Sequence, residues 1–166
     1  MAAGFKHQGR LDMEKVPITR EGYENLKKEL ERMIKVERPE NIKAIESARA
    51  HGDIAENAEY HAAKDRQSFI EGRINELQVQ LGSSEIISTD IEHEKAVFGA
   101  KVTLEHVETG QQKRYMLVGP YESAPEEGKI SVKSPLGQAL IGKEEGDLVR
   151  VKTPSGIQEM EIVEIE

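Results

Sequence analysis

Apolar residues in two stretches of the chain recur at alternating spacings of three and four, which is typical of a helix with one buried stripe. The first stripe consists of Tyr23, Leu26, Leu30 and Met33. The second stripe consists of Tyr60, Ala63, Gln67, Ile70, Ile74, Leu77 and Leu81. Thr19 can cap the first helix, which would begin at Arg20, and Gly82 can cap the end of the second. Each stripe needs a partner, so the pattern predicts two helices that pack against each other.

An antiparallel hairpin is the simplest way to join the two stripes. In that arrangement Leu26 pairs with Leu81, Leu30 with Leu77 and Met33 with Ile74, and the turn falls midway, at residues 51–53. Gly52 lies there, and glycine is the residue that most readily adopts a left-handed turn. The first arm has about 30 residues between Tyr23 and the turn, so the hairpin would project roughly 45 Å from its base.

Two features modify the first arm and the end of the hairpin. Pro39 should interrupt or kink the first arm, after which the apolar positions move to Ile42 and Ile45. Near the turn the side chains become small, which predicts a slender end, although alanine is also the best helix former. These alanines are Ala44, Ala48, Ala50, Ala58, Ala62 and Ala63.

From residue 84 onward the periodicity changes to that of short strands separated by turn residues. The strand-like runs are 85–91, 96–107, 113–118, 129–132, 147–153 and 157–165. Residues 109–110 and 154–156 are typical of hairpin connections, and residues 134–142 indicate a short helix bounded by glycine. The predicted fold class is therefore α+β, with a long helical hairpin over residues 13–82 and a small domain with a mostly antiparallel sheet over 83–166. Residues 1–12 precede a second methionine and are expected to be a disordered extension or a vector-derived remnant.

Composition narrows the classes of function. The chain is 37% hydrophobic, 33% charged and 4% aromatic with no Trp, which is too polar for a large enzyme core with a deep aromatic pocket. The absence of Cys excludes disulfides, thiolate metal sites and cysteine nucleophiles. No apolar run suits a membrane span or a signal peptide, so a cytoplasmic protein is expected. Phosphate-loop, dinucleotide and serine-hydrolase motifs do not occur.

The charge distribution favours a protein partner over autonomous binding to nucleic acid. The net charge is −8, and residues 83–166 carry nine basic and sixteen acidic residues. A duplex-binding surface needs an excess of basic groups, which neither half offers. A local set of basic residues could still touch a phosphate backbone, or could simply belong to solvated helix faces. This set comprises Lys35, Arg38, Lys43, Arg49, Lys64 and Arg66.

Three carboxylates, Asp53, Glu56 and Glu59, lie at or just after the expected turn. One interpretation is a capping box, with Asp53 as the N-cap of the second helix and Glu56 at its third position. The other is that Asp53 and Glu56 offer oxygens to one Mg²⁺ whose remaining ligands come from elsewhere. The two interpretations are compatible, because a cap would fix the direction of the carboxylates. His51 and His61 flank the turn at a spacing that matches no zinc protease pattern.

Three motifs together resemble the bacterial Gre transcript cleavage factors, and the resemblance extends over residues 13–166. They are His51-Gly52-Asp53-Ile54-Ala55-Glu56-Asn57-Ala58-Glu59-Tyr60-His61-Ala62-Ala63, Phe98-Gly99-Ala100, and Ser134-Pro135-Leu136-Gly137-Gln138-Ala139-Leu140-Ile141-Gly142. The mixed charges along the hairpin favour the GreA type over the GreB type. The resemblance implies a coiled-coil hairpin followed by a domain similar to the FK506-binding-protein fold.

The resemblance also implies a mechanism in which the protein is an accessory factor and not itself an enzyme. The C-terminal domain would dock on RNA polymerase through Ser134, Pro135, Leu136 and Gly137, and the hairpin would enter the secondary channel. Asp53 and Glu56 would then help the polymerase hold a second Mg²⁺ for hydrolysis of backtracked nascent RNA. Asn57 and Tyr60 would shape the end of the hairpin, and Lys43, Arg49, Lys64 and Arg66 are candidate RNA contacts.

Two other functions are compatible with the same sequence. One is a coiled-coil regulator that binds in the polymerase channel and blocks it without cleavage. The other is peptidyl-prolyl isomerase activity in the C-terminal domain. That activity needs an aromatic proline pocket, and residues 83–166 contain only Phe98, Tyr115 and Tyr121 as aromatic residues.

Overall fold

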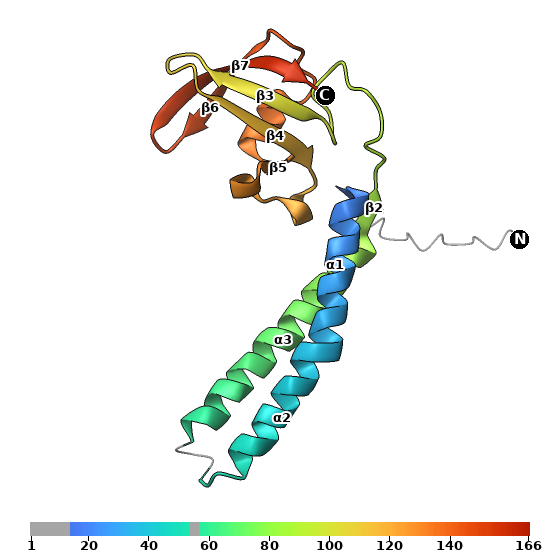
Figure 1. The fold of residues 1–166 in the computed structure, drawn as a ribbon, viewed down its shortest axis with the longest axis vertical. Coiled ribbons are helices and arrows are strands. Elements are labelled where there is room, and N and C mark those ends of the chain that lie inside the picture. Colours follow the sequence, from blue (N-terminus) through green and yellow to red (C-terminus); the bar gives the residue numbers. More distant parts are fainter. Residues whose placement is uncertain (1–13, 54–56) are drawn as a thin grey trace, which may run out of the picture.

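The computed structural model describes residues 14–53 and 57–166, and in it a two-armed helical hairpin projects from a small sheet domain (Figure 1). The first arm contains α1 (Arg20–Arg32), a π-helical segment η1 (Met33–Glu37) and α2 (Arg38–Arg49). The second arm is the single helix α3 (Ala58–Ser83). The expectations for residues 1–12 and for Glu56 fall outside the described residues. The predicted α+β class with a long helical hairpin is confirmed.

The two apolar stripes meet along the hairpin. Ile18, Leu26, Met33, Ile70, Ile74 and Leu77 form one buried cluster. Tyr23, Leu30 and Leu81 pack against this cluster while remaining partly exposed. Thr19 caps α1 as expected, because its Oγ1 accepts a hydrogen bond from the backbone N–H of Gly22 at 3.0 Å. The heptad pattern therefore identified the buried faces of both arms.

Pro39 interrupts the first arm, and it does so through a π-helical segment. Proline has no N–H to donate, and its ring would clash with the carbonyl four residues earlier. In η1 the helix is widened, so that the N–H of Arg38 donates to the carbonyl of Met33, five residues back. The wider turn contains one residue more than a turn of regular α-helix. It therefore changes which residues of α2 face the other arm. Ile45 is buried as expected, but the expectation for Ile42 is wrong, because Asn41 is buried in its place and Ile42 is 44% exposed.

Asn41 places a polar side chain in the interface between the arms. Its Nδ2 donates to the backbone carbonyl of Ala63 at 3.1 Å, whereas its Oδ1 is buried without a hydrogen-bond partner among the described residues. The hydrogen bond joins α2 to α3 and thus pairs residue 41 of the first arm with residue 63 of the second. A buried asparagine of this kind favours one register of paired helices at some cost in stability.

Ion pairs on the surface of the hairpin connect the same arms. Arg73 forms a two-pronged pair with Glu29, with nitrogen–oxygen distances of 2.8 and 2.9 Å. Arg38 forms a similar pair with Glu71 at 2.7 and 2.9 Å. Paired hydrogen bonds between a guanidinium and a carboxylate fix geometry as well as charge. These two pairs therefore reinforce the register that the apolar stripes set.

The pair between Glu29 and Arg73 predicts a dependence of stability on pH. The hydrogen bond from Arg73 lowers the pKa of Glu29, against the opposing effect of burial, and the charges of Arg73 and Arg32 lower it further. The stabilisation is complete above the unfolded-state pKa and is lost as pH falls below about 4.3. The change in melting temperature between about pH 7 and pH 3 should therefore be smaller for Glu29→Gln than for the wild type. Glu46→Gln, at an exposed site on α2, is the control, and equal acid sensitivity of Glu29→Gln and wild type would contradict the prediction.

The ends of the arms differ in how well the sequence predicted them. Gly52 has a φ of +129°, so the expected left-handed turn is present between the arms. Gly82 does not cap α3, which continues to Ser83. The hydroxyls of Ser83 and Ser84 both donate to the carbonyl of Gln80. This carbonyl lies in the last turn of α3, where a glycine cap would otherwise have provided a backbone N–H as the donor.

A short two-stranded parallel sheet closes the base of the hairpin. Strand β1 (Val16–Ile18) pairs with β2 (Ser84–Ile86), and Ile18 is fully buried. Only the first part of the run at 85–91 is therefore a strand. The strand β1 was not predicted, because three residues that include a proline carry too little pattern.

The C-terminal sheet has the order β5-β4-β3-β7-β6. Its strands are β3 (Lys101–His106), β4 (Gln112–Val118), β5 (Lys129–Ser131), β6 (Leu148–Thr153) and β7 (Gly156–Ile165). All pairs are antiparallel except β4 with β5, so the expected mostly antiparallel sheet is confirmed. The long run at 96–107 contributes a strand only from Lys101. The helix α4 (Pro135–Leu140) and the short 3₁₀ helices η3 (Pro120–Glu122) and η4 (Pro125–Glu127) complete the domain.

One core lies between this sheet and α4. Val102 and Leu104 from β3, Leu117 from β4 and Ile162 from β7 pack with Leu140 of α4 in a single buried cluster. Within the part of the chain that the structure describes, no helix has the length and apolar composition that crossing a membrane requires.

Candidate functional site

The end of the hairpin is held together by Asn57. This residue is the N-cap of α3, since its Oδ1 accepts the N–H of Tyr60 at 3.2 Å. Its Nδ2 donates to the backbone carbonyl of Ala48 on α2 at 2.6 Å. One side chain therefore starts the second arm and ties it to the first. The expectation that Asn57 shapes the end of the hairpin has a geometric basis in these two hydrogen bonds.

Asp53 lies in the connection between α2 and α3, at the end of the hairpin remote from the sheet domain (Figure 1). It is exposed. The capping-box interpretation is wrong for α3, because Asn57 and not Asp53 is the N-cap of that helix. Asn57 has an advantage over Asp53 as the N-cap, because its side-chain amide also donates a hydrogen bond to the first arm. The capping-box interpretation also placed Glu56 at the third position of the helix, and Glu56 lies outside the described residues.

Tyr60 is packed between side chains of both arms. The guanidinium of Arg49 lies 5.8 Å from the centre of the Tyr60 ring, within range of a cation–π interaction. The rings of Tyr60 and His61 meet edge to face at 5.7 Å. Arg49 at the end of α2 is thus linked to the first turn of α3. This contact gives Arg49 a structural role in addition to its expected contact with RNA.

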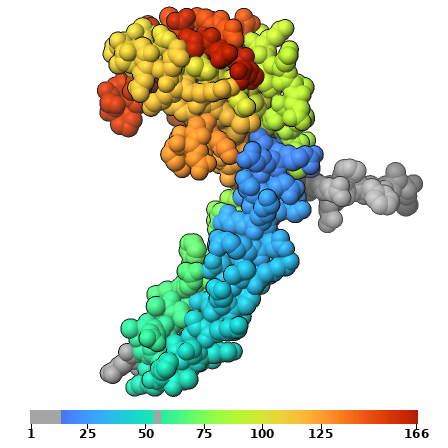
Figure 2. All heavy atoms as spheres, viewed as in Figure 1, coloured from blue at the N-terminus to red at the C-terminus, as the bar shows by residue number. Residues whose placement is uncertain are grey.

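The hairpin stays narrow up to its end. Figure 2 shows the space-filling surface reduced to a thin rod below the sheet domain. Ala48 on α2 and Ala63 on α3 are the buried residues of the interface near the turn, and their small side chains allow the arms to approach closely. The other alanines singled out in the sequence are exposed.

The candidate RNA contacts have different surroundings. Arg66 forms an ion pair with Glu37, and Lys64 donates to Gln67 at 2.8 Å. Lys43 is exposed on α2. Arg38, from the wider basic set, is paired with Glu71. Neutralised pairs attract phosphate less than isolated cations do, so Arg66 and Arg38 are less suited to contact RNA than Lys43 and Lys64.

The described part of the chain contains no group of three or more His, Asp or Glu side chains that could hold a metal ion. Asp53 offers carboxylate oxygens, which are ligands that Mg²⁺ accepts, and Mg²⁺ commonly completes its coordination with water and groups on a substrate. An exposed carboxylate of this kind can donate oxygens to a metal ion together with other ligands.

The segment expected to dock on a partner begins α4. Ser134 is its N-cap, with its Oγ accepting the N–H of Gly137 at 3.0 Å and donating to the carbonyl of Ser131 at 2.6 Å. Pro135 is exposed and Leu136 is half-buried. Gly137 is buried against β5, and a Cβ there would lie 2.0 Å from the Ser131 carbonyl oxygen. Gly137 thus supports the segment, while Pro135 and Leu136 offer surface.

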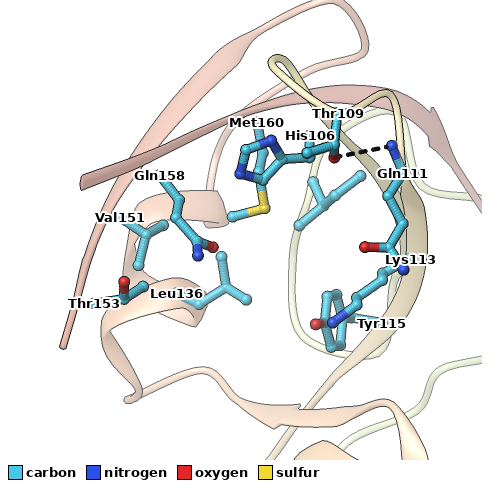
Figure 3. A pocket seen from close by; sticks show the side chains of 11 residues that line it. His106, Thr109, Gln111, Lys113, Tyr115, Leu136, Val151, Thr153, Gln158 and Met160 are labelled. Atoms are coloured by element: carbon cyan, nitrogen blue, oxygen red, sulfur yellow. Dashed lines mark hydrogen bonds between the residues drawn. The ribbon is translucent and has the colours of Figure 1, made fainter. Parts of the chain in front are cut away.

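Leu136 also lines a cavity of about 480 Å³ on the face of the sheet beside α4 (Figure 3). Apart from Thr109, which lies in the turn before β4, the other lining residues lie in pairs or triples two apart along the chain, so each group faces one side of the sheet. They are Leu104 and His106; Thr109; Gln111, Lys113 and Tyr115; Val151 and Thr153; and Gln158 and Met160. Apart from Tyr115, named only as an aromatic residue, these residues were not predicted from the sequence, although period-two spacing on several strands was the signal available.

The composition of this cavity bears on the isomerase alternative. Tyr115 lines it, whereas Tyr121 packs against the hairpin cluster and Phe98 is not among the lining residues. A proline pocket built from several aromatic rings is therefore not present at this cavity. The lining mixes apolar side chains, among them Leu104, Leu136 and Met160, with polar side chains such as His106 and Gln158.

Comparison with known proteins gives consistent matches over both parts of the chain. The family model for the N-terminal part of transcription elongation factors matches residues 16–86, and the model for the C-terminal part of GreA/GreB transcription elongation factors matches residues 91–166. The solved structure of GreA factor homolog 1 (Gfh1) of Thermus thermophilus is 30% identical, covers 92% of this chain and 99% of that chain, and has a TM-score of 0.43.

Curated relatives match over nearly their whole length. Transcription elongation factor GreA of Syntrophobacter fumaroxidans is 54% identical over 154 residues, which cover 92% of this chain and 99% of the relative. GreA of Syntrophus aciditrophicus is 55% identical over 154 residues, with 92% and 96% covered. With both family models matched and relatives of this identity, the chain belongs to the GreA/GreB family of transcription elongation factors.

Proposed function

We propose that the protein binds RNA polymerase and stimulates the polymerase's own cleavage of backtracked nascent RNA. The observation that supports this most directly is the position of Asp53, exposed at the end of a narrow hairpin and remote from the sheet domain. Such a rod can place a carboxylate inside a channel that a globular domain cannot enter. The family to which the chain belongs and the names of its relatives agree with a role in transcription elongation.

In this proposal Asp53, together with Glu56, contributes oxygens to a Mg²⁺ that the polymerase also holds. Bound there, the ion would activate a water molecule and stabilise the developing charge during phosphodiester hydrolysis. Asn57 keeps the two arms joined beside Asp53 through its hydrogen bonds to Tyr60 and Ala48. The pairing of the arms further up limits bending of the rod, so that the carboxylate is presented in a defined place.

Docking is assigned to the surface formed by Ser134, Pro135, Leu136 and the adjoining cavity. The exposed Pro135 and half-buried Leu136 lie beside a cavity lined by both apolar and polar side chains, a combination suited to a partner side chain or helix. Gly137 lets α4 pack closely against β5 beneath this surface, since no side chain fits between Gly137 and Ser131. The hairpin and the docking surface thus carry separate parts of the function.

The test is to mix the protein with stalled, backtracked elongation complexes and follow the length of the labelled RNA. Addition of the protein is expected to shorten the RNA and restore elongation from the new 3′ end. A regulator that only blocks the channel would bind the complexes and leave RNA length unchanged. That outcome would contradict the proposed cleavage and favour the regulator.

A further inference from the structure

The sheet domain and the hairpin meet at η3, where one carboxylate binds the start of α1. Glu122 accepts the backbone N–H of Thr19 through Oε2 at 2.7 Å and the Thr19 hydroxyl through Oε1 at 2.5 Å. The two residues are 103 positions apart in the chain. Hydrogen bonds to an ionised acceptor are among the stronger ones, and a two-pronged contact fixes direction as well as distance.

The same threonine starts the helix that it joins to the sheet domain. Thr19 is 6% exposed, and its Oγ1 accepts the N–H of Gly22 while donating to Glu122. The carboxylate therefore lies at the N-terminal end of α1, where the helix dipole favours negative charge. A rotation of α1 relative to η3 would break the hydrogen bond between Glu122 and Thr19 Oγ1, the same atom that caps α1.

Two glycines allow this close approach and leave no space for a side chain at either position. A Cβ on Gly119 would lie 1.9 Å from the carbonyl oxygen of Pro17, and a Cβ on Gly22 would lie 2.7 Å from Oε1 of Glu122. Gly119 also donates its N–H to Glu122 at 3.4 Å. The joint is thus closely packed, backbone against backbone at Gly119 and backbone against the Glu122 side chain at Gly22, which limits its movement.

The other arm is held by the neighbouring residue of η3. Tyr121 packs against the buried cluster of the hairpin, and its hydroxyl is hydrogen bonded to Ser83 Oγ at the end of α3, with an oxygen–oxygen distance of 3.0 Å. Successive residues of one short helix therefore contact the beginning of α1 and the end of α3. Two separate anchor points define the direction of a rod, whereas one would allow it to pivot.

We propose that Glu122 is a positioning residue for transcript cleavage, because it fixes the direction of the hairpin relative to the docking surface. This inference rests on the proposed function. The helix α3 has 26 residues and is about 39 Å long, so a change of about 10° at the joint would move the far end by roughly 7 Å. Displacements of about 1 Å can cost 100-fold in reactions that depend on positioning.

The test compares Glu122→Ala with Glu126→Ala, an exposed glutamate on the adjacent η4, in the full-length protein. Stalled elongation complexes are titrated with each variant to obtain the maximal cleavage rate and the concentration at half-saturation. Glu122→Ala should lower the maximal rate at least about tenfold and change half-saturation less than about threefold, since the docking surface is intact. Glu126→Ala should match the wild type.

A second measurement reports the direction of the hairpin without polymerase. The chain has no Cys, so Asp65→Cys on α3 and Lys152→Cys on β6 give a unique pair of spin labels at exposed sites. The inter-label distance distribution should be narrow for the wild type and broad or shifted for Glu122→Ala. Thr19→Val, which removes the hydroxyl partner, should broaden it in the same way, and Thr19→Ser should not.

The two measurements separate failure of this inference from failure of the proposed function. An unchanged distance distribution in both Glu122→Ala and Thr19→Val would overturn the assignment of Glu122, whatever the cleavage assay shows. A broadened distribution with an unchanged maximal rate would overturn the link between direction and cleavage. Absence of cleavage with the wild-type protein would refute the proposed function, while the distance measurement would still test the joint.

Discussion

Replacement of Asp53 by asparagine should reduce the stimulation of RNA cleavage by about 100-fold or more, the scale seen when one electrostatic contact to a transition state is removed. Asparagine has nearly the same size as aspartate and keeps a side-chain oxygen that can support a turn. Asp53 is exposed, and Asn57 rather than Asp53 caps α3, so the fold of the hairpin should be preserved. What is lost is the negative charge needed at a shared Mg²⁺.

This result is checked by single-turnover cleavage in stalled elongation complexes, with binding followed separately by competition against labelled wild-type protein. Asp65→Asn, at an exposed position on α3, removes one negative charge from the same hairpin and should have little effect on either quantity. Combining Asp53→Asn with Glu56→Gln should abolish the remaining stimulation. Full cleavage by Asp53→Asn would exclude the carboxylate from the reaction and leave the hairpin as a purely steric element.

The second large effect is expected for Gly137→Ala, which should destabilise the sheet domain by about 3 kcal/mol or more and weaken docking. The new Cβ would lie 2.0 Å from the Ser131 carbonyl oxygen and 3.0 Å from the Cα of Val132. These neighbours are backbone atoms of β5 and of the residue after it, and they cannot move aside as a flexible side chain could. Either α4 separates from β5 or the Ser134 cap is lost, and both would change the surface around Pro135 and Leu136.

Gly72→Ala is the matched control, because Gly72 lies on α3 and a Cβ there would have no atom within 4 Å beyond its own stretch of helix. In a helix interior this substitution should stabilise the protein by up to about 1 kcal/mol. Denaturant unfolding of both variants measures the difference, and binding to polymerase core enzyme measures docking. A Gly137→Ala protein as stable as the wild type and with unchanged binding would show that α4 can shift without consequence.

The sequence predicted the hairpin well because its information is local and periodic. The stripe from Tyr23 to Met33 and the one from Tyr60 to Leu81 specify two helices with one buried face each, and Gly52 marks the turn. The predictions failed where a single residue alters the geometry of a helix. At Pro39 the sequence indicates an interruption but not its form, and the π-helical segment that resulted buried Asn41 in place of Ile42.

The start of α3 shows a second kind of failure. Asp53 and Asn57 are both good N-cap residues, so local preference alone did not decide between them. Asn57 caps the helix and also reaches the carbonyl of Ala48 on the other arm, a contact that exists only after the arms have paired. The N-cap of α3 therefore depends on tertiary packing, because Asp53 and Asn57 are equivalent by local preference.

By itself, the sequence determined the two arms, the turn between them, the carboxylate at their end and the sheet class of the C-terminal domain, because each follows from contacts or preferences within a few residues. The tertiary structure alone decided where the hairpin points and which residues line the cavity beside α4. The contact of Glu122 with Thr19 joins residues 103 positions apart, and no local pattern in the chain encodes such a contact. It depends on the shapes of two folded parts that meet only when both are complete.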